Sequence, residues 1–437
     1  MRRQSKLAVC ILMLSCAAAG CNDRPLMPTP NLYLGAGDNP FNDVPQEFRN
    51  NLVDVLYVTD RESSDTTNGS VKYDHHRSTS LAFGSCIVEI GDNVSWSVLV
   101  ENSRKSRRSV SLSLKTKKTT ERGRFPATPL TVRATSEGLV ENPEEVRQQN
   151  LVASKLQDDI TERLKKTQCK EAFVYLHGFN NTFEDTVFVA ADLWHFMGRR
   201  GVPIVYSWPS KRSLFGYGYD RESSEFTVFH FKQFLRSIAG CKDLKKIHVL
   251  AHSRGTDVAA SAFRELVIAA NASPKPGGPK PDSPGQSAHR VLHKIGNVVL
   301  AAADIDMEVA SQRLVAEMAF MSAERVTIYL SHDDKAMNFA VWLFESIGRL
   351  GELSLRFFSP GLVDTLETID RIDFIDARVN TGFLGHTYFY SSPAVSSDLI
   401  LLLRDNLEPG NGRPLTCHEE TSQYWSIGKD YPYTQAE

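Results

Sequence analysis

The sequence predicts an α/β protein in which a mostly parallel sheet has helices on both faces and an antiparallel β portion comes first. Three observations predict it. Short apolar runs alternate with helix-compatible stretches from residue 172 onward, as expected of strands buried on both sides. Before that region, residues 52–101 read as successive strands with no helix between them. A serine with small neighbours, Ser253, stands where one apolar run passes into a helical stretch.

The N-terminal part of the domain is expected to be β-rich. Strand-like runs lie at residues 52–59, 80–91 and 95–101. Residues 104–143 are polar and ambiguous, with β-leaning pieces at residues 109–114 and 130–134, and we expect an irregular segment there. A helix is predicted over residues 144–166, because apolar residues recur at four-residue spacing from Val152 to Leu164.

The remainder of the chain alternates between the two element types. Strands are predicted at residues 172–176, 202–206, 247–251, 298–303, 326–330 and 371–378. Helices are predicted at residues 183–200, 223–239, 257–271, 307–319 and 394–406. Short strands alternating with helices favour a parallel sheet whose strands are joined by crossover helices.

With 41% hydrophobic and 23% charged residues, the composition is that of a globular protein. We expect one domain over residues 51–408, with the irregular segment and a Pro/Gly-rich surface insertion at residues 271–290 inside it. Residues 21–50, rich in Pro, Asn and Asp, are expected to be a tether, and residues 409–437 a tail.

The first 21 residues have the order of an export signal. Three basic residues within residues 1–6 precede an apolar run of thirteen at residues 7–19, which is too short to span a bilayer. The sequence Ala18-Ala19-Gly20-Cys21 then resembles a bacterial lipobox. We therefore expect residues 1–20 to be a signal peptide and Cys21 to be acylated. The protein would then be lipid-anchored to the membrane in the bacterial cell envelope, facing the periplasm or the exterior.

Charge and cysteine spacing exclude some classes of function. The net charge of −2 becomes more negative once the basic signal is removed, which gives no argument for nucleic-acid binding. No Cys-x-x-Cys spacing occurs beyond Cys21, so we expect no metal site. Cys169 and Cys241 each precede a predicted strand. If these strands are parallel neighbours, the two thiols share one sheet edge, and we expect a disulfide between them.

Ser253 has the setting of a nucleophile elbow, in which a sharp strand-to-helix turn exposes a serine hydroxyl. The turn requires small residues two before and two after the serine, and Ala251 and Gly255 meet that requirement. A serine needs a base that removes its proton and a carboxylate that orients the base. In chain order Ser–acid–His, Asp333 and Asp334 follow one predicted strand, and His386 follows the last. Asp304, at the end of an earlier strand, is an alternative acid.

An oxyanion hole needs two backbone N–H groups directed at the developing charge. One is expected to be that of Arg254, the residue after the nucleophile. The other is expected in the loop His177-Gly178-Phe179-Asn180, which ends a buried strand, and we assign it to Phe179.

These motifs together resemble a bacterial α/β-hydrolase family of unassigned function, over residues 52–403. The residues that carry the resemblance are Tyr57-Val58-Thr59-Asp60-Arg61, Ala82-Phe83-Gly84-Ser85-Cys86, His177-Gly178-Phe179-Asn180, Phe183-Glu184-Asp185, Ser207-Trp208-Pro209-Ser210, Ala251-His252-Ser253-Arg254-Gly255, residues 300–306, residues 329–337 and Gly385-His386. The resemblance implies the α/β-hydrolase fold and favours Asp334 over Asp333 as the acid. It does not supply a substrate.

The sequence thus predicts a serine hydrolase of the carboxylesterase or lipase type, without metal or organic cofactor. Its substrate is expected to be a small-molecule or lipid ester, because esters need the least assistance to the leaving group. Two alternatives remain open. One is a non-catalytic envelope lipoprotein that uses the fold for binding or as a scaffold. The other is an acyltransferase, in which an alcohol replaces water.

Overall fold

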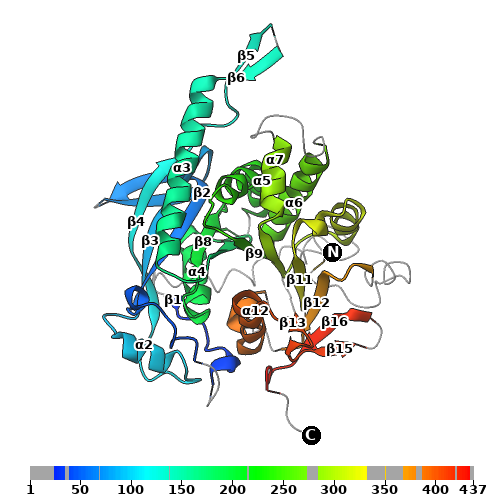
Figure 1. Ribbon diagram of the computed structural model, residues 1–437. Helices are drawn as coiled ribbons and strands as arrows, with labels where there is room; N and C mark the ends of the chain where they lie inside the picture. Colours follow the sequence, from blue (N-terminus) through cyan, green and yellow to red (C-terminus); the bar gives the residue numbers. More distant parts are fainter. Residues whose placement is uncertain are drawn as a thin grey trace, which may run out of the picture.

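A computed structural model describes residues 24–34, 39–67, 69–136, 138–213, 216–272, 284–331, 350, 368–379, 386–418 and 421–433. Their main feature is a twelve-stranded sheet with the strand order β1-β4-β3-β2-β8-β7-β9-β10-β11-β12-β16-β15. Figure 1 shows this sheet running through the molecule, with helices on both sides of it.

The centre of the sheet is parallel, as predicted. It consists of β7 (Glu171–Leu176), β8 (Val202–Ser207), β9 (Lys246–His252), β10 (Ile295–Ala301), β11 (Arg325–Leu330) and β12 (Ile372–Ala377). In the register, Leu176 lies beside both Tyr206 and Ala251, and Ala301 lies beside both His252 and Tyr329. The carboxyl ends of these strands therefore meet at one edge, where sites form in open α/β sheets.

The N-terminal β portion is antiparallel, again as predicted. Strands β2 (Leu52–Thr67), β3 (Ser70–Ile90) and β4 (Ser113–Arg124) pair in sequence. Because β2 also runs parallel to β8, the two portions form one continuous sheet.

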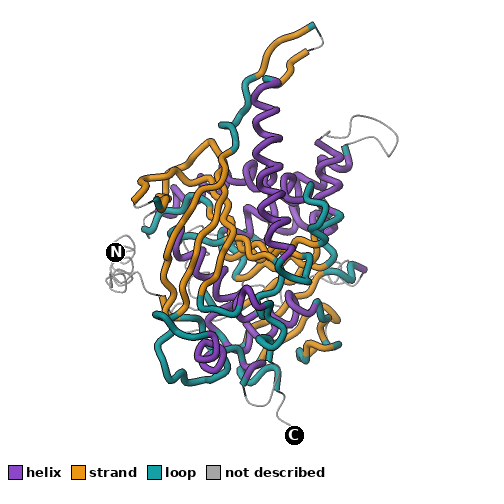
Figure 2. The backbone as a smooth tube through the Cα atoms, turned by 60° about the vertical axis from the view of Figure 1, so that its left-hand side comes forward, coloured by secondary structure: helices purple, strands orange, loops and turns teal. Residues whose placement is uncertain are grey.

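Helices cover both faces of the sheet (Figures 1 and 2). One face carries α3 (Pro143–Lys165), α5 (Tyr217–Ala239), α6 (Gly255–Asn271) and α7 (Pro284–Leu292); the other carries α4 (Phe183–Phe196) and α12 (Pro393–Asp405). Strand residues alternate between the two cores: Val174 belongs to the first and Tyr175 to the second. Within the described chain, no helix is both long enough and apolar enough to cross a membrane.

Two local predictions in the N-terminal half were wrong. Residues 95–101, expected as a strand, form helix α2 (Trp96–Asn102), whose N-cap Ser95 accepts a hydrogen bond from the backbone of Val98. The polar segment at residues 104–143 contains the long strand β4 and a hairpin of β5 (Val132–Thr135) and β6 (Gly138–Glu141). Every described side chain of this hairpin is exposed, and Figure 2 shows it projecting beyond the end of α3.

The expected tether is part of the folded body from residue 24 onward. Strand β1 (Arg24–Pro25) pairs with β4, and Leu26, Met27 and Tyr33 are almost wholly buried. The Tyr33 hydroxyl donates to the carbonyl of Phe196 at the end of α4. The sequence suggested a linker because this segment has no periodicity. In the structure, single aromatic side chains of the segment pack on α4: Tyr33 lies against Phe196 and Phe41 against His195.

The C-terminal region is likewise integrated rather than a loose tail. Strand β16 (Thr421–Ile427) extends the sheet parallel to β12, and β15 (Thr416–His418) pairs with β16. The predicted helix at residues 307–319 is divided into α8 (Met307–Ala310), a π-helical turn (Ser311–Ala316) and a short 3₁₀ turn (Ala319–Ser322). Inside the expected insertion, α7 packs against α6.

A fully buried ion pair holds the C-terminal region to α12. Both Asp398 and Arg413 have no exposed side-chain surface. Asp398 Oδ2 accepts from Arg413 Nη2 at 2.5 Å and from the Tyr329 hydroxyl at 2.6 Å. Its Oδ1 accepts from the Tyr431 hydroxyl at 2.6 Å. One carboxylate on α12 therefore joins strand β11 to two segments of the C-terminal region.

Asp398→Ala leaves the Arg413 charge buried without its counter-charge. We expect the free energy of unfolding to fall by about 3–5 kcal/mol, measured by urea denaturation followed by circular dichroism. Glu162→Ala removes a carboxylate from the exposed pair with Lys165 and should leave the midpoint unchanged. Equal midpoints for Asp398→Ala and the wild type would contradict this role for the C-terminal region.

Candidate active site

Ser253 stands at the turn between β9 and α6 in a left-handed conformation, with φ of 51°. This conformation is unfavourable for a residue with a side chain and persists only where its surroundings impose it. The Ser253 N–H donates to Ala301 O at 2.9 Å, and its carbonyl accepts from the N–H and the hydroxyl of Thr256. The backbone on both sides of the serine is thus fixed, as a nucleophile elbow requires.

Two close backbone contacts explain the small residues around the elbow. A Cβ on Gly255 would lie 2.3 Å from the carbonyl oxygen of His177. A Cβ on Gly178 would lie 2.5 Å from the Cβ of Ser253 and 3.1 Å from its Oγ. Gly178 therefore allows the loop after β7 to lie directly against the nucleophile. Sequence reasoning assigned no role to Gly178, although its place in the His-Gly pair was a usable signal.

The loop after β7 fixes the peptide unit between Gly178 and Phe179. The Gly178 carbonyl lies 2.8 Å from Nδ1 of His177 and accepts from the side-chain amide of Asn181 at 3.2 Å. In a trans peptide the N–H of Phe179 points the opposite way from that carbonyl. Among the described residues, neither this N–H nor that of Arg254 donates to any acceptor. Within the described part of the chain both N–H groups are therefore unengaged; one directly follows Ser253, and the other belongs to the loop that lies against it.

His177 is a supporting residue of this loop. Its ring is buried and stacks on Trp208, with ring centroids 4.8 Å apart and planes within 3°. Burial, together with the nearby Arg61 charge, lowers the pKa of His177 well below its usual value, so the ring is neutral. The Arg61 guanidinium lies 3.5 Å from Nε2. Nε2 also lies 3.1 Å from the carbonyl of Trp208, while Nδ1 lies 2.8 Å from that of Gly178, so the single ring proton of neutral His177 serves one of these two carbonyls.

Arg61 is a residue whose role the sequence did not reveal. Its buried guanidinium donates to Ser207 Oγ at 2.9 Å, Ser210 O at 3.2 Å and Asn181 O at 2.9 Å. Burial lowers the pKa of Arg61 to about 10, against the opposing effect of Asp60 and Asp220. It therefore remains charged at neutral pH and links the loops after β8 and β7.

The structure brings His386 to the elbow. Nε2 of His252, the residue before the nucleophile, donates to the backbone carbonyl of His386 at 2.9 Å. The two rings have centroids 4.8 Å apart, and the Phe389 ring lies equally close to His252. Burial and the neighbouring His386 ring lower the pKa of His252 to about 3, against the opposing effect of this hydrogen bond. A neutral His252 thus joins the histidine loop to the strand that carries Ser253.

Of the three candidates for the acid that orients the histidine, the described residues include only Asp304. Asp333 and Asp334 lie outside the described residues. Asp304, the alternative, is buried, and its N–H donates to Ser253 O at 3.4 Å. Its carboxylate accepts from the Tyr217 hydroxyl at 2.7 Å, and the Tyr217 ring lies 5.3 Å from that of Phe179. Asp304 therefore lies next to the nucleophile and is bonded to the α5 side of the site.

Cys169 and Cys241 are both free thiols, so the predicted disulfide is wrong. Strands β7 and β9 are neighbours, but the two side chains face different layers. Cys241 belongs to the core beneath α5 and α6, whereas Cys169 packs against the core on the α4 side. Cys21 lies outside the described residues. In the part of the chain that the structure describes, no group of three potential metal ligands occurs.

Comparison with known proteins identifies the family. A family described as "Alpha/beta hydrolase of unknown function (DUF900)" matches residues 152–404. The chain belongs to this α/β-hydrolase family. The matched residues include the elbow, the loop after β7 and His386. The mostly parallel sheet with helices on both faces is the α/β-hydrolase fold.

Solved structures and curated proteins add little to this assignment. Among solved structures, esterase 2 of Thermogutta terrifontis in its apo form is 14% identical in sequence. The match covers 55% of this chain and 86% of the esterase chain, with a TM-score of 0.28. A lipase-esterase related protein from Clostridium acetobutylicum is 13% identical in sequence. That match covers 52% of this chain and 81% of the other protein, with a TM-score of 0.21. No curated protein matches the chain.

His252→Gln should reduce the loss of unfolding free energy that occurs when the pH falls from 7 to 5. Between pH 7 and 5 the unfolded chain gains a proton at this histidine while the native chain does not, so native stability is full above pH ~6.5 and falls as the pH drops. A pKa of about 3 predicts that the wild type loses about 2 kcal/mol at pH 5 through this ring. The glutamine retains a donor for His386 O but does not titrate.

Urea unfolding at both pH values measures the difference. His293→Gln, at an exposed histidine, is the matched control and should follow the wild type. Parallel pH dependence of His252→Gln and the wild type would show that His252 is not held neutral in the folded state.

Proposed function

We propose that this α/β-hydrolase is a serine hydrolase that cleaves carboxylic esters through an acyl-enzyme at Ser253. The observation that carries the proposal is the left-handed Ser253 at the carboxyl edge of the sheet, with the Phe179 and Arg254 N–H groups available beside it. A strained serine next to two N–H groups that have no acceptor among the described residues is an arrangement suited to acyl transfer. It has no evident use in a purely structural turn.

The proposed reaction has two halves. Ser253 Oγ attacks the ester carbonyl carbon while His386 takes the hydroxyl proton, and the Phe179 and Arg254 N–H groups stabilise the oxyanion. The C–O bond to the alcohol then breaks, and His386 returns the proton to the departing alkoxide. Water, deprotonated by His386, attacks the acyl-enzyme and releases the acid together with free Ser253. Asp334 orients His386 in this scheme, with Asp333 and Asp304 as the alternatives.

Several buried groups would support this chemistry without touching the substrate. Gly178 and the neutral His177 fix the peptide that carries the Phe179 N–H, and Arg61 holds the loop that contains it. The side chain of Arg254 is bonded to Asp257 at 2.7 Å and to Ser224 at 3.1 Å. It thus contributes its backbone donor, while its charge is balanced within the protein.

A fluorophosphonate probe tests the activated nucleophile directly. We expect stoichiometric phosphonylation of the wild type at Ser253, found by peptide mass spectrometry, together with hydrolysis of p-nitrophenyl acetate. Ser253→Ala should lose both, a fall of at least about 10³-fold in kcat/KM. Ser97→Ala, at an exposed serine on α2, is the matched control. A folded wild type that reacts with neither reagent would instead favour the binding or scaffold role.

We also propose that Cys21 carries a lipid anchor, on the basis of the lipobox-like sequence that ends there. Arg24 is bound to the body through its ion pair with Asp192 at 3.2 Å and its contact with the Tyr390 ring at 4.6 Å. Three residues span at most about 11 Å. An acylated Cys21 would therefore keep the hydrolase body close to the bilayer instead of on a long tether.

Expression with alkyne-palmitate in a bacterial host tests the anchor. We expect the probe on the wild type, recovered with membranes, and its loss in Cys21→Ser. Cys10→Ser, which removes another cysteine of the N-terminal segment, should retain labelling. Equal labelling of Cys21→Ser and the wild type would exclude acylation at this position.

A further inference from the structure

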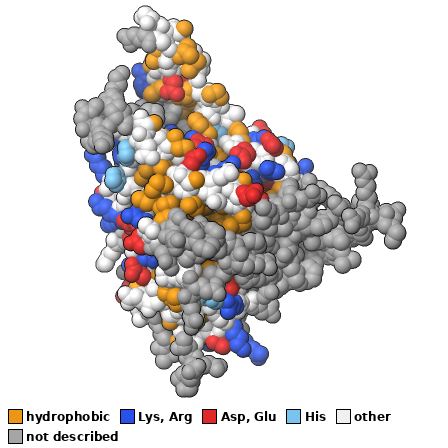
Figure 3. Space-filling model, turned by 90° about the vertical axis from the view of Figure 1, so that its right-hand side faces the viewer, with side chains coloured by type: hydrophobic (Ala, Val, Ile, Leu, Met, Phe, Trp, Pro, Cys, Tyr) orange, Lys and Arg blue, Asp and Glu red, His pale blue; other side chains and the backbone are white. Residues whose placement is uncertain are grey.

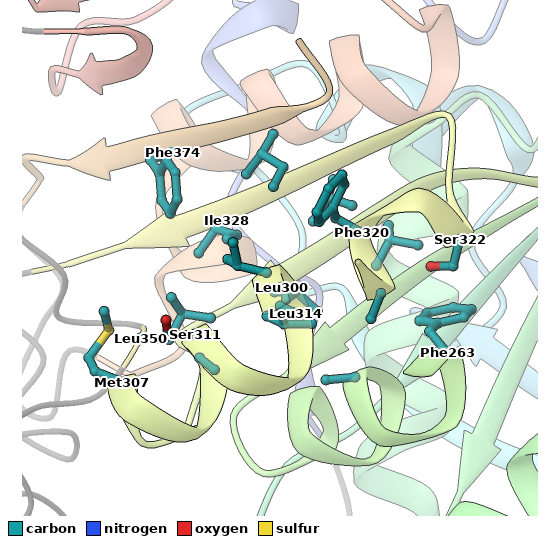
Figure 4. A pocket seen from close by; sticks show the side chains of 17 residues that line it. Phe263, Leu300, Met307, Ser311, Leu314, Phe320, Ser322, Ile328, Leu350 and Phe374 are labelled. Carbon is teal, nitrogen blue, oxygen red and sulfur yellow. The ribbon is translucent and has the colours of Figure 1, made fainter. Parts of the chain in front are cut away.

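An apolar cavity lies between the α6 side of the sheet and the segment at residues 307–322 (Figure 4). The volume of this cavity, measured with a water-sized sphere, is about 70 Å³. Its lining is apolar except for the hydroxyl-bearing residues Ser311 and Ser322. The side chains that define it are Leu300, Ile328 and Phe374 from the strands, Ala260 from α6, and Leu314 and Phe320 from the covering segment.

The cavity and the candidate active site share two structural elements, strand β10 and helix α6. Leu300 directly precedes Ala301, whose carbonyl accepts the Ser253 N–H at 2.9 Å. Ala260 lies on the helix that begins at the elbow. In Figure 4 the arrowheads of the strands point to the side on which Met307 and Leu350 lie, with Phe263 at the other end. One end of the cavity therefore lies towards the carboxyl edge, the edge that carries Ser253.

The chemistry of the lining selects an alkyl group. Water in an apolar cavity forgoes hydrogen bonds, so such spaces are filled favourably by hydrocarbon. One water needs roughly 10–15 Å³ by this measure of volume, so the cavity has room for about five water-sized groups. This corresponds to an acyl chain of roughly four to six carbons.

The covering segment is irregular where it crosses the cavity. It contains the π-helical turn Ser311–Ala316, a type of turn that is frequent at functional sites, followed by Met318 in a left-handed conformation with φ of 55°. Met318 and Met321 are 53% and 44% exposed. Figure 3 shows hydrophobic side chains gathered near the middle of the face that is the right-hand side of Figure 1. The cover thus combines an uneven backbone with adaptable methionines.

We propose that this cavity is the acyl subsite of the hydrolase and holds the alkyl chain of the ester that Ser253 attacks. The proposal rests on the serine-hydrolase function proposed above and names its substrate class, esters of short- to medium-chain carboxylic acids.

The test is the chain-length profile of kcat/KM for p-nitrophenyl acetate, butyrate, hexanoate and decanoate. For the wild type we expect a rise of about fourfold per added methylene up to roughly six carbons, and no further gain beyond. Ala260→Leu fills part of the cavity and should lower the hexanoate-to-acetate ratio at least tenfold. Leu314→Ala enlarges the cavity and should move the optimum to longer chains.

Two matched controls separate cavity effects from general damage to α6. Ala269→Leu and Ile268→Ala change the same helix at positions that do not line the cavity, and both should retain the wild-type ratio. An unaltered ratio in Ala260→Leu, with acetate still hydrolysed, would overturn the acyl subsite and leave the proposed function standing. Absence of ester hydrolysis and of Ser253 labelling in the wild type would overturn both.

Discussion

The candidate site depends on one buried charge. The Arg61 guanidinium has lost its water, which is a large cost for an isolated ion, and its donors are directed at protein oxygens from three separate segments. These bonds hold the loops after β7 and β8 against β2, just beyond the residues of β2 that pair with β8. Because Arg61 comes from a strand rather than a loop, the rigid sheet fixes the position of the loop that lies against Ser253.

The second constraint is the narrow space between this loop and the elbow. Gly178 and Gly255 each take a position where even a methyl group would overlap neighbouring atoms. The close packing keeps Ser253 in its left-handed conformation, and Arg61 keeps the loop in contact. Neither feature suffices alone, since a loop without its anchor could withdraw, and an anchored loop with a larger residue at position 178 could not approach.

The sequence predicted the elements that are specified by residues close together in the chain. The parallel strands follow from apolar runs, and the Ser253 turn follows from small residues at fixed spacing. The sequence did not predict β4, whose side chains are mostly polar and partly exposed, or β16, which joins the sheet by long-range pairing. The role of Arg61 was equally hidden, because its guanidinium donates to four oxygens from other segments and not to its neighbours in the chain. The Cys169–Cys241 prediction failed because strand adjacency does not determine which face a side chain occupies.

The sheet separates the two halves of the site. Phe389, against which His252 packs and which lies three residues after His386, belongs to the core on the α4 and α12 side, whereas the cavity beneath residues 307–322 belongs to the core on the α6 side. Ser253 stands at the edge between them, with its strand bonded to β10 and its helix lining the cavity. In the reaction proposed above, the proton carrier and the alkyl chain would therefore reach the serine from opposite layers. Because the two layers form separate clusters of buried residues, we expect substitutions that resize the proposed acyl subsite to leave the His252–His386 contact in place.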